Sequence, residues 1–328
     1  MGEDGIRRRT FLKGAGVAAL TVVGAGQSEK GTAQSVVPNS AGTEPPRVKA
    51  PANACDCHHH IYDAVRFRPP PEATTPVQPS ARVEEYRQLQ RRIGTTRSIV
   101  VTPSAYGTDN RVTLDAIARF GGGARGVAVV RADVTDAELN TLAAGGIRGI
   151  RFSLAVANGI ARPLPPTTIA AIESLGTRVH ALGWHVQFNV TADQIVAAED
   201  LLNRLSAPLV FDHMGHIPQP AGIDHPAYRI IRRLVDKGRT WVKLSVTYDS
   251  STIGPPTYAD VNKVGTAYVR AAPERMLWGS NWPHPNETQK PNDAKLFDLL
   301  SEWAPEEATR HRILVENPET LYGFMNGR

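Results

Sequence analysis

The sequence predicts an α/β fold, a single (β/α)8 TIM barrel, and two observations support this prediction. Short runs rich in β-branched residues recur along the 328-residue chain, and amphipathic segments typical of helices lie between them. There are eight such runs over roughly 275 residues, which matches a barrel, whereas a doubly wound open sheet normally has fewer strands. The eight expected strands are Cys55–Ile61, Arg97–Thr102, Gly126–Arg131, Ile147–Ser153, Trp184–Val190, Pro208–His213, Thr240–Val246 and Arg275–Asn281.

The N-terminus, residues 1–33, has the features of a twin-arginine export signal. Arg7, Arg8 and Arg9 precede a weakly apolar stretch rich in Gly and Ala, and residues 32–34 offer a small-residue cleavage point. The stretch is too short and too weakly apolar to span a bilayer. We therefore expect a periplasmic protein without a membrane span.

Two Pro-rich segments flank the first expected strand. Residues 34–52 are expected to be a linker, and residues 66–80 to form a long ordered loop at the mouth of the functional site. Residues 53–328 are expected to form one catalytic domain, the barrel itself.

The first expected strand carries the most informative motif, CDCHHHIYD at residues 55–63. Because side chains alternate across a strand, the expected faces are Asp56, His58 and His60 on one side and Cys55, Cys57 and His59 on the other. Two imidazoles side by side can bind a metal ion, polarise a carbonyl or move a proton. Asp56 is a candidate either to orient one of the inward histidines or to have a purely structural role, and His59 is expected to pack against the barrel or to lie at the surface.

Helix starts are marked twice further along the chain. The segments Thr135–Glu138 and Thr191–Gln194 match the capping-box pattern, in which a threonine begins a helix and a Glu or Gln follows three residues later. After the second segment, Leu201, Leu202 and Leu205 continue the apolar face expected of a helix.

Charge and cysteine content exclude several classes of protein. Removing residues 1–33 takes away five basic and three acidic residues, so the net charge falls from +5 to +3, and no Lys/Arg run is interleaved with aromatic residues. This argues against nucleic acid as a partner and is compatible with a small anionic substrate.

The two cysteines, Cys55 and Cys57, cannot make a disulfide framework. We expect them to be small buried hydrophobes on the outward face of the first strand, beneath a helix. The oligomeric state is left open.

The functional residues of a TIM barrel lie at the carboxyl ends of its strands, and this rule selects the candidates. We expect the chemistry to involve His58, His60, His213, Asn281 and His284. We expect the substrate to be bound by Ser104, Tyr106, Arg151, Gln187, Lys243, Ser245 and Tyr248. Arg148 lies three residues before Arg151 and so on the opposite strand face, which favours Arg151 as the residue that enters the site and clamps an oxyanion.

Eight motifs in chain order carry a resemblance to a known family. They are CDCHHHIYD (55–63), PSAYGTDNR (103–111), ARGVAVV (124–130), GIRGIRFS (146–153), DHMG (212–215), WVKLS (241–245), LWGSNWPHP (277–285) and ENPETLYGF (316–324). Together they resemble the amidohydrolase superfamily. Within it they resemble the branch of 2-pyrone-4,6-dicarboxylate lactonases, 4-sulfomuconolactone hydrolases and galactarolactone isomerases. The resemblance implies an amidohydrolase-like barrel and an enzyme that acts on small, anionic, oxygenated rings.

Three positions depart from the metal-binding pattern of that superfamily, which adds a Lys on strand four, a His on strand five and an Asp on strand eight. Strand four of this chain offers Arg148 and Arg151, strand five offers Gln187 and strand eight offers Asn281. A two-metal centre is therefore not expected. The family's strand-eight Asp commonly activates water, and the amide of Asn281 cannot do so.

Two cofactor states stay open. One divalent ion, Zn or Mn, held by His58, His60 and His213 would leave a fourth position for water. A site without any metal is the alternative.

These patterns lead to three functional hypotheses. The first is a hydrolase that opens a small anionic lactone of the sulfomuconolactone or pyrone-dicarboxylate kind. In it, His58, His60 and His213 polarise the ring carbonyl, and His284 or a metal-bound hydroxide is the base. The second is a metal-independent lactone isomerase of the galactarolactone type, which Asn281 favours. The third is an exported metal- or ligand-binding protein without catalytic activity.

Overall fold

The structure is a computed structural model that describes residues 36–71, 81–154 and 164–324. The chain divides into Met1–Gln34 and Ser35–Arg328, and the description concerns the second part. The expected export signal lies outside the described residues, as do residues 72–80 of the expected loop at 66–80. Within the described part, no helix combines the length and the apolar character that crossing a membrane requires.

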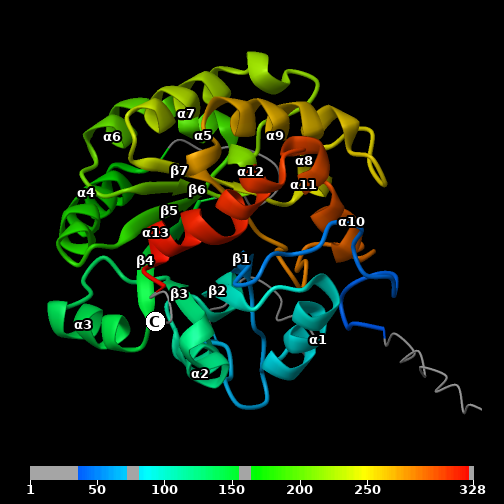
Figure 1. Cartoon of the computed structure of the whole chain (residues 1–328). Coiled ribbons are helices and arrows are strands. Elements are labelled where there is room, and N and C mark those ends of the chain that lie inside the picture. Colours follow the sequence, from blue (N-terminus) through cyan, green and yellow to red (C-terminus); the bar gives the residue numbers. More distant parts are fainter. Residues whose placement is uncertain (1–35, 72–80, 155–163, 325–328) are drawn as a thin grey trace, which may run out of the picture. The chain divides into compact units, whose positions relative to one another are not determined.

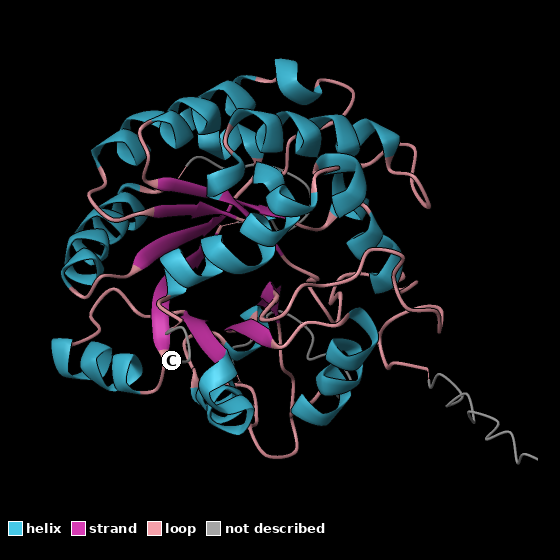
Figure 2. Ribbon diagram, in the orientation of Figure 1, coloured by secondary structure: helices cyan, strands magenta, loops and turns pink. Residues whose placement is uncertain are grey.

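Eight parallel strands form one sheet in the order β1 to β8. They are β1 (Cys55–His59), β2 (Arg97–Val101), β3 (Ala124–Ala128), β4 (Ile147–Ser153), β5 (His185–Asn189), β6 (Leu209–Phe211), β7 (Thr240–Leu244) and β8 (Met276–Trp278). Two backbone hydrogen bonds join the sheet ends, because the Asn281 amide donates to His58 O (2.7 Å) and the His60 amide donates to Trp282 O (2.8 Å). The result is a nearly closed barrel surrounded by helices (Figures 1 and 2), which confirms the predicted (β/α)8 fold.

Helices follow the strands as the sequence pattern predicts. The α-helices are α1 (Val83–Ile93), α2 (Arg111–Phe120), α3 (Asp136–Ala144), α4 (Pro166–Ala181), α5 (Ala192–Ala197), α6 (Glu199–Arg204), α7 (Pro226–Asp236), α8 (Thr247–Ser250), α9 (Ala259–Ala271), α10 (Asp293–Asp298), α11 (Leu300–Trp303), α12 (Glu307–His311) and α13 (Asn317–Tyr322). Both predicted capping boxes are confirmed, since Thr135 accepts the amide of Glu138 and Thr191 accepts the amide of Gln194.

Only β4 has its expected bounds, and the other seven strands are shorter than expected or shifted. β3 starts at Ala124 rather than at Gly126. β6 ends at Phe211 and β8 at Trp278, because the backbone φ of His213 is 53° and that of Asn281 is 63°. Positive φ angles are incompatible with a strand. His213 and Asn281 therefore lie in tight turns directly after their strands.

The predicted alternation of side chains along β1 holds for His58, His59 and His60 but is wrong for Cys55, Asp56 and Cys57, because β1 contains a β-bulge. Asp56 pairs with Ser98 and His59 pairs with Val100, so β1 has one more residue than β2 across the same interval. Asp56 and His59 consequently face α1, where both contact Tyr86.

The two cysteines face the barrel interior and not, as predicted, a helix outside it. They are fully buried and free, in an apolar cluster with Ile99, Val101, Val127, Val210, Trp241, Leu277, Tyr322 and Phe324. Tyr322 belongs to α13, which closes the amino end of the barrel, where Arg97 at the start of β2 pairs with Glu319 (2.6 Å). Figure 1 shows this helix crossing the ring of strands.

The segment from residue 36 to 52 packs on the barrel and is not a free linker. Val37 and Ser40 are buried, and Pro38 O accepts the indole N–H of Trp282 (2.7 Å). The amide of Arg47 donates to Asp298 of α10 (2.7 Å). This N-terminal strap is therefore part of the folded unit.

Candidate active site

A cavity of about 570 Å³ opens at the carboxyl ends of the strands. Its walls are polar and come from most of the strand ends. They include His60, Tyr62, Ser104, Arg151, Asn189, Thr191, His213, His216, Gln219, Tyr248, Asp249, Asn281 and Glu287. A volume of this size suits one small-molecule ligand.

The three predicted histidines lie together, with His60 and His213 lining this cavity and His58 fully buried next to them. Nε2 of His58 lies 3.3 Å from Nε2 of His60, and the rings of His58 and His213 are 4.8 Å apart between centroids. Burial lowers the pKa of His60 to about 3 and lowers those of His58 and His213 well below the usual range. Burial thus favours the neutral form of each ring, in which the ring acts as a hydrogen-bonding group.

Asp212 is the centre of the cluster, and the sequence prediction did not include it among the site residues. Its Oδ1 lies 3.1 Å from Nδ1 of His58, and its Oδ2 accepts from Nε of Arg151 (2.9 Å) and from Nε2 of Gln187 (3.0 Å). Nζ of Lys243 lies 3.5 Å from Oδ1. Its position in the sequence could have identified Asp212, because it is an acidic residue at the end of a strand and directly precedes His213, which the prediction included.

Asp212 is ionised although it is fully buried. Burial alone would raise its pKa, but His58, Lys243 and Arg151 together hold the pKa well below the usual range. Burial also lowers the pKa of Lys243, against the opposing effect of Asp212. One carboxylate thus faces two basic side chains, and the cluster keeps an excess of positive charge.

Hydrogen-bond partners restrict the tautomers of the paired histidines. Nδ1 of His60 donates to Val101 O (2.8 Å), so Nε2 presents a lone pair to His58. If Lys243 donates to Nδ1 of His58 (3.2 Å), Nε2–H of His58 can donate to His60. If Nδ1–H of His58 donates to Asp212 instead, the Nε2 lone pairs of His58 and His60 face each other. That arrangement is favourable only with a shared proton or a cation between the two nitrogens.

The ligand types in this cluster favour a metal ion, whereas the charge of the cluster disfavours one. One ligand atom each of His58, Asp212 and His213 lies within 4.8 Å of the others, so this cluster could hold a metal. Asp212 thus joins the group in place of His60, which the sequence prediction had chosen. However, both oxygens of Asp212 already contact Arg151, Lys243, Gln187 or His58. A divalent cation would enter a site with surplus positive charge, so the residues fit a metal poorly.

Three residues predicted to bind substrate lie behind the cavity wall. Lys243 and Gln187 are fully buried beneath Asp212 and contact each other (2.7 Å). Ser245 lies 2.9 Å from Nδ1 of His213 and orients that ring. Neither these three nor His58 is among the described residues that line the cavity. Their contacts instead position His58, Asp212 and His213.

The two residues predicted after strand two have different positions. Ser104 lines the cavity. Tyr106 is buried and its hydroxyl accepts the amide of Asp63 (3.0 Å), so it supports the loop instead. Tyr62, which the sequence prediction missed, lines the cavity in its place.

Arg151 enters the site, whereas Arg148 does not. The guanidinium of Arg148 donates to the carbonyls of Ala143 and Ile147, near the start of β4. Arg151 lines the cavity and uses Nε for its bond to Asp212. No hydrogen bond joins its two terminal nitrogens to other described residues, and those nitrogens can serve a ligand.

Asp56 and His59 support the first strand from outside the site. Asp56 accepts the backbone amide of His58 (3.1 Å) and does not orient its ring, which Asp212 does. Asp56 also accepts from Tyr86 and from Ser280, and burial raises its pKa to about 6. The His59 ring stacks on Tyr86 at 3.6 Å between centroids.

The residues after β8 and β7 form a second polar group at the cavity wall. Asn281 and Tyr248 line the cavity, and Nδ2 of Asn281 donates to the Tyr248 hydroxyl (2.9 Å). His284, predicted as the base, is fully buried and lies behind Tyr248, 2.9 Å from its hydroxyl through Nδ1. A base at His284 therefore reaches a substrate only through Tyr248.

The outer wall of the cavity holds a further histidine that the sequence prediction did not select. Nδ1 of His216 lies 3.0 Å from Asp249, and its Nε2 lies 2.9 Å from the side-chain oxygen of Asn189. All three residues line the cavity. Polar side chains thus extend from the strand ends to the outer wall of the cavity.

Comparisons with known proteins agree with this geometry. The family profile described as Amidohydrolase matches residues 55–324. A 4-sulfomuconolactone hydrolase of Rhizobium radiobacter is 32% identical over 84% of this chain and 91% of its own. A 2-pyrone-4,6-dicarboxylate hydrolase of Comamonas testosteroni is 32% identical over 86% and 94%. A D-galactarolactone isomerase of Agrobacterium fabrum is 31% identical over 84% and 93%.

Solved structures give the same result. An apo Agrobacterium tumefaciens protein has a TM-score of 0.76 and 31% identity, covering 86% of this chain and 100% of its own. A probable 2-pyrone-4,6-dicarboxylic acid hydrolase of Acinetobacter baumannii, solved with bound citric acid, has a TM-score of 0.71 and 25% identity, covering 83% and 100%.

Proposed function

The chain belongs to the amidohydrolase family, and on this premise we propose that it is a hydrolase that opens a small anionic lactone. Relatives at about 32% identity are lactone hydrolases or isomerases, which supports an enzyme that acts on lactones. In the proposed reaction water attacks the ring carbonyl, and the ring C–O bond then breaks to give a hydroxy acid.

The observation that best supports this function is the positively charged floor of the cavity. Arg151, held by Asp212, and His213, whose ring is fixed by Ser245, both line the cavity. Donors held in this way stabilise an oxyanion better than the carbonyl from which it forms, and stabilisation of this kind lowers the barrier. The same surplus charge suits a substrate that carries a carboxylate or sulfonate.

Size, charge and relatives together support the proposed substrate class. The cavity of about 570 Å³ accommodates a single oxygenated ring. Relatives named for sulfomuconolactone and pyrone dicarboxylate, and a similar structure with bound citric acid, support an anionic ligand with several oxygens.

Lactone isomerisation is a second candidate, and Asn281 favours it. A relative is named as a galactarolactone isomerase, and an amide at the strand-eight position cannot take a proton from water as a carboxylate can. A hydroxyl of the substrate would then attack the carbonyl in place of water. The same donors at Arg151 and His213 would stabilise the oxyanion.

The proposed reaction does not require a metal ion. The excess positive charge around Asp212 supports this part of the proposal. Elemental analysis of enzyme purified without chelator or added metal tests it, and activity should survive dialysis against a chelator. Stoichiometric zinc or manganese whose removal abolishes turnover would contradict it.

Three lactones distinguish these functions: 4-sulfomuconolactone, 2-pyrone-4,6-dicarboxylate and galactarolactone. A pH-stat should record one acid equivalent per lactone opened if the enzyme is a hydrolase. Proton NMR should instead show interconverting lactones without open acid if it is an isomerase. If every lactone stays unchanged while the protein binds a metal ion tightly, the binding-protein hypothesis gains support and both enzymatic functions fail.

A further inference from the structure

We propose that Tyr248, His284 and Asp293 form a proton relay that opens onto the cavity and replaces the carboxylate missing at the end of strand eight. The inference rests on the proposed function, because a lactone-acting enzyme must remove a proton from its nucleophile. It does not depend on whether that nucleophile is water or a substrate hydroxyl.

The three side chains form a continuous chain of hydrogen bonds. The Tyr248 hydroxyl lies 2.9 Å from Nδ1 of His284, and Nε2 of His284 lies 3.2 Å from Oδ2 of Asp293. Tyr248 lines the cavity, whereas His284 and Asp293 are fully buried. Only Tyr248 can touch a substrate, and the other two act through it.

The partners define where each proton sits. We assign the Nε2 proton of His284 to the bond with Asp293, because a carboxylate accepts only, and we assign the lone pair of the resting ring to Nδ1. The Tyr248 hydroxyl must then donate to Nδ1, while its oxygen accepts from Nδ2 of Asn281 (2.9 Å). One further lone pair on the Tyr248 oxygen is left for a nucleophile in the cavity.

Asn281 has a definite role in this arrangement. Its amide cannot serve as a base, but its N–H fixes the Tyr248 oxygen so that the hydroxyl proton points to His284. Burial raises the pKa of Tyr248 well above its usual range. The phenol therefore stays protonated and passes protons on, rather than storing a negative charge.

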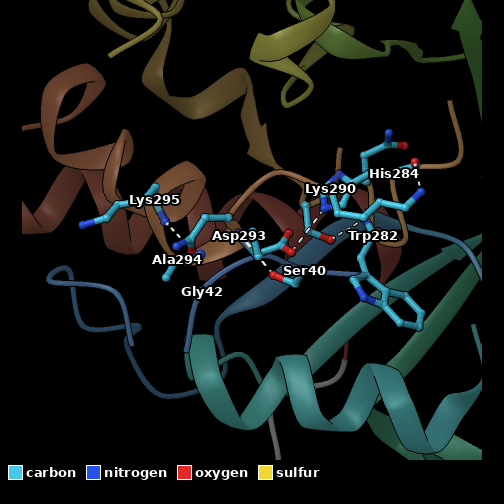
Figure 3. Close-up of polar contacts among 12 residues, drawn as sticks. Ser40, Gly42, Trp282, His284, Lys290, Asp293, Ala294 and Lys295 are labelled. Carbon is cyan, nitrogen blue, oxygen red and sulfur yellow. Dashed lines mark hydrogen bonds and ion pairs between the residues drawn. The ribbon is translucent and has the colours of Figure 1, made fainter. Parts of the chain in front are cut away.

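The far end of the relay is shielded from solvent by the N-terminal strap. Ser40 of the strap accepts the backbone amide of Asp293 (3.3 Å), and Trp282 is fully buried beside it with its indole on Pro38 O. In Figure 3 dashed lines join Asp293 to Ser40 and to His284, and Nζ of Lys290 donates to the His284 carbonyl (2.7 Å). Oδ1 of Asp293 has no hydrogen-bond partner among the described residues. The charge of this carboxylate is thus available to stabilise a proton that arrives on His284.

The proposed step balances without any outside reagent. As the nucleophile oxygen bonds to the lactone carbonyl carbon, its proton moves to the Tyr248 oxygen. The original Tyr248 proton moves to Nδ1 of His284, and the resulting imidazolium is paired with Asp293. When the ring C–O bond breaks, the leaving alkoxide takes a proton from Tyr248, and Nδ1 of His284 returns its proton to Tyr248.

A measurement on the resting enzyme tests the relay without any substrate. Nitrogen-15 NMR of histidine-labelled protein, assigned with His284→Gln, should show His284 protonated at Nε2 and unprotonated at Nδ1. Tyr248→Phe should shift the Nδ1 signal, and Tyr228→Phe, which removes a phenol hydroxyl on α7, should not. A proton on Nδ1, or no response to Tyr248→Phe, would overturn the relay.

Kinetics with a lactone that the enzyme turns over provide the second test. Tyr248→Phe should lower kcat by about 10²–10⁴-fold with little change in KM, and His284→Gln should lower kcat in the same direction. The exposed control His180→Gln should leave kcat unchanged. A plot of kcat against deuterium fraction should be curved for the native enzyme, because two protons move, and linear for Tyr248→Phe.

The two proposals can fail separately. Unchanged kcat in Tyr248→Phe, or a change confined to KM, rejects the relay while lactone turnover stands. If no lactone in the panel reacts, the proposed function fails, and the NMR result alone decides whether the relay exists.

Discussion

At the scale of single residues, Asp212 explains why so many polar side chains can be buried in one place. It contacts His58, Arg151, Gln187 and Lys243 at once. Among the described residues, none of these four side chains contacts a second carboxylate. Removing one partner from a buried charge cluster costs far more than the cluster contributes overall. The site therefore depends on this carboxylate for its geometry as well as its charge.

Asp212→Asn tests this role through stability. Lys243 and Arg151 would stay buried without a negative partner, so the free energy of unfolding should fall by about 3–5 kcal/mol in a denaturant titration. Asp133→Asn serves as the matched control, because its partner Arg131 is exposed and the pair is worth little. Equal stability losses in the two variants would contradict the account.

The buried neutral histidines predict a pH dependence, and His59 isolates one of them. Burial lowers the pKa of His59 well below 6.5, so below that pH the unfolded chain binds a proton that the folded protein does not. Stability should therefore fall as pH drops from 6.5, by about 1.4 kcal/mol per pH unit for each such group.

His59→Phe keeps the stacking on Tyr86 and removes the titrating ring. Denaturant titrations at pH 7 and pH 5 should show a smaller loss of stability on acidification for this variant than for the native chain. His180→Gln, at an exposed position, should keep the native pH dependence. An unchanged slope in His59→Phe would show that His59 is protonated in the folded state.

At the scale of elements, the barrel is closed where β1 meets the turn after β8, and this seam places His58. A Cβ on Gly279 would lie 2.7 Å from Cβ of His58 and 3.1 Å from its backbone nitrogen. The close approach lets Asn281 donate to His58 O and Ser280 donate to Asp56. The positions of His58 and Asn281 therefore depend on one small residue.

Gly279→Ala should therefore push β1 away from β8. We expect a loss of about 1–3 kcal/mol in stability from overpacking, together with reduced lactone turnover. Gly122→Ala, where a Cβ would have no neighbour within 4 Å, should change neither. Thermal unfolding and initial rates measure both, and a fully active, fully stable Gly279→Ala would contradict the role of the seam.

The elements also show what sequence reasoning could and could not reach. Strand and helix order followed from periodicity, and the capping threonines Thr135 and Thr191 followed from local chemistry. The bulge in β1 did not, because alternation assumes a regular ladder and the extra residue is visible only against β2. The ends of β6 and β8 were also predicted too late in the chain. The positive φ angles of His213 and Asn281 end these strands, and such angles depend on tertiary hydrogen bonds rather than on local propensity.

The candidate site was predicted only in part, because its geometry also depends on tertiary structure. The strand-end rule selected His58, His60 and His213, whose rings converge. The rule could not separate residues that line the cavity from those beneath it. As a result Lys243 and Gln187 were predicted to bind the substrate, and His284 was predicted to contact it. Depth in a barrel is set by three-dimensional packing, which no single strand encodes.

At the scale of the whole molecule, the barrel ends are specialised. α13 and the apolar cluster around Cys57 close the amino end, while the carboxyl end carries the polar cavity. Arg92 of α1 fastens the strap through the carbonyls of Ala41 and Gly42, so the N-terminal strap covers the back of the relay. Stability and chemistry are thus assigned to opposite faces.

Export of the whole chain remains our proposal and has its own test. Arg8→Lys combined with Arg9→Lys should retain the protein, with residues 1–33 uncleaved, inside the cell. The native chain should appear in the periplasmic fraction at the mass expected after cleavage near residue 33. A native chain that stays uncleaved in the cytoplasm would contradict the proposal.

The central claim is that the cluster around Asp212 activates a lactone carbonyl toward water. Turnover of the three lactones in ¹⁸O-labelled water, followed by mass spectrometry, tests it most directly. We predict that the product acid of one lactone carries a single ¹⁸O atom in its new carboxylate. Products that form without any ¹⁸O would show that water is not the nucleophile and would contradict the claim.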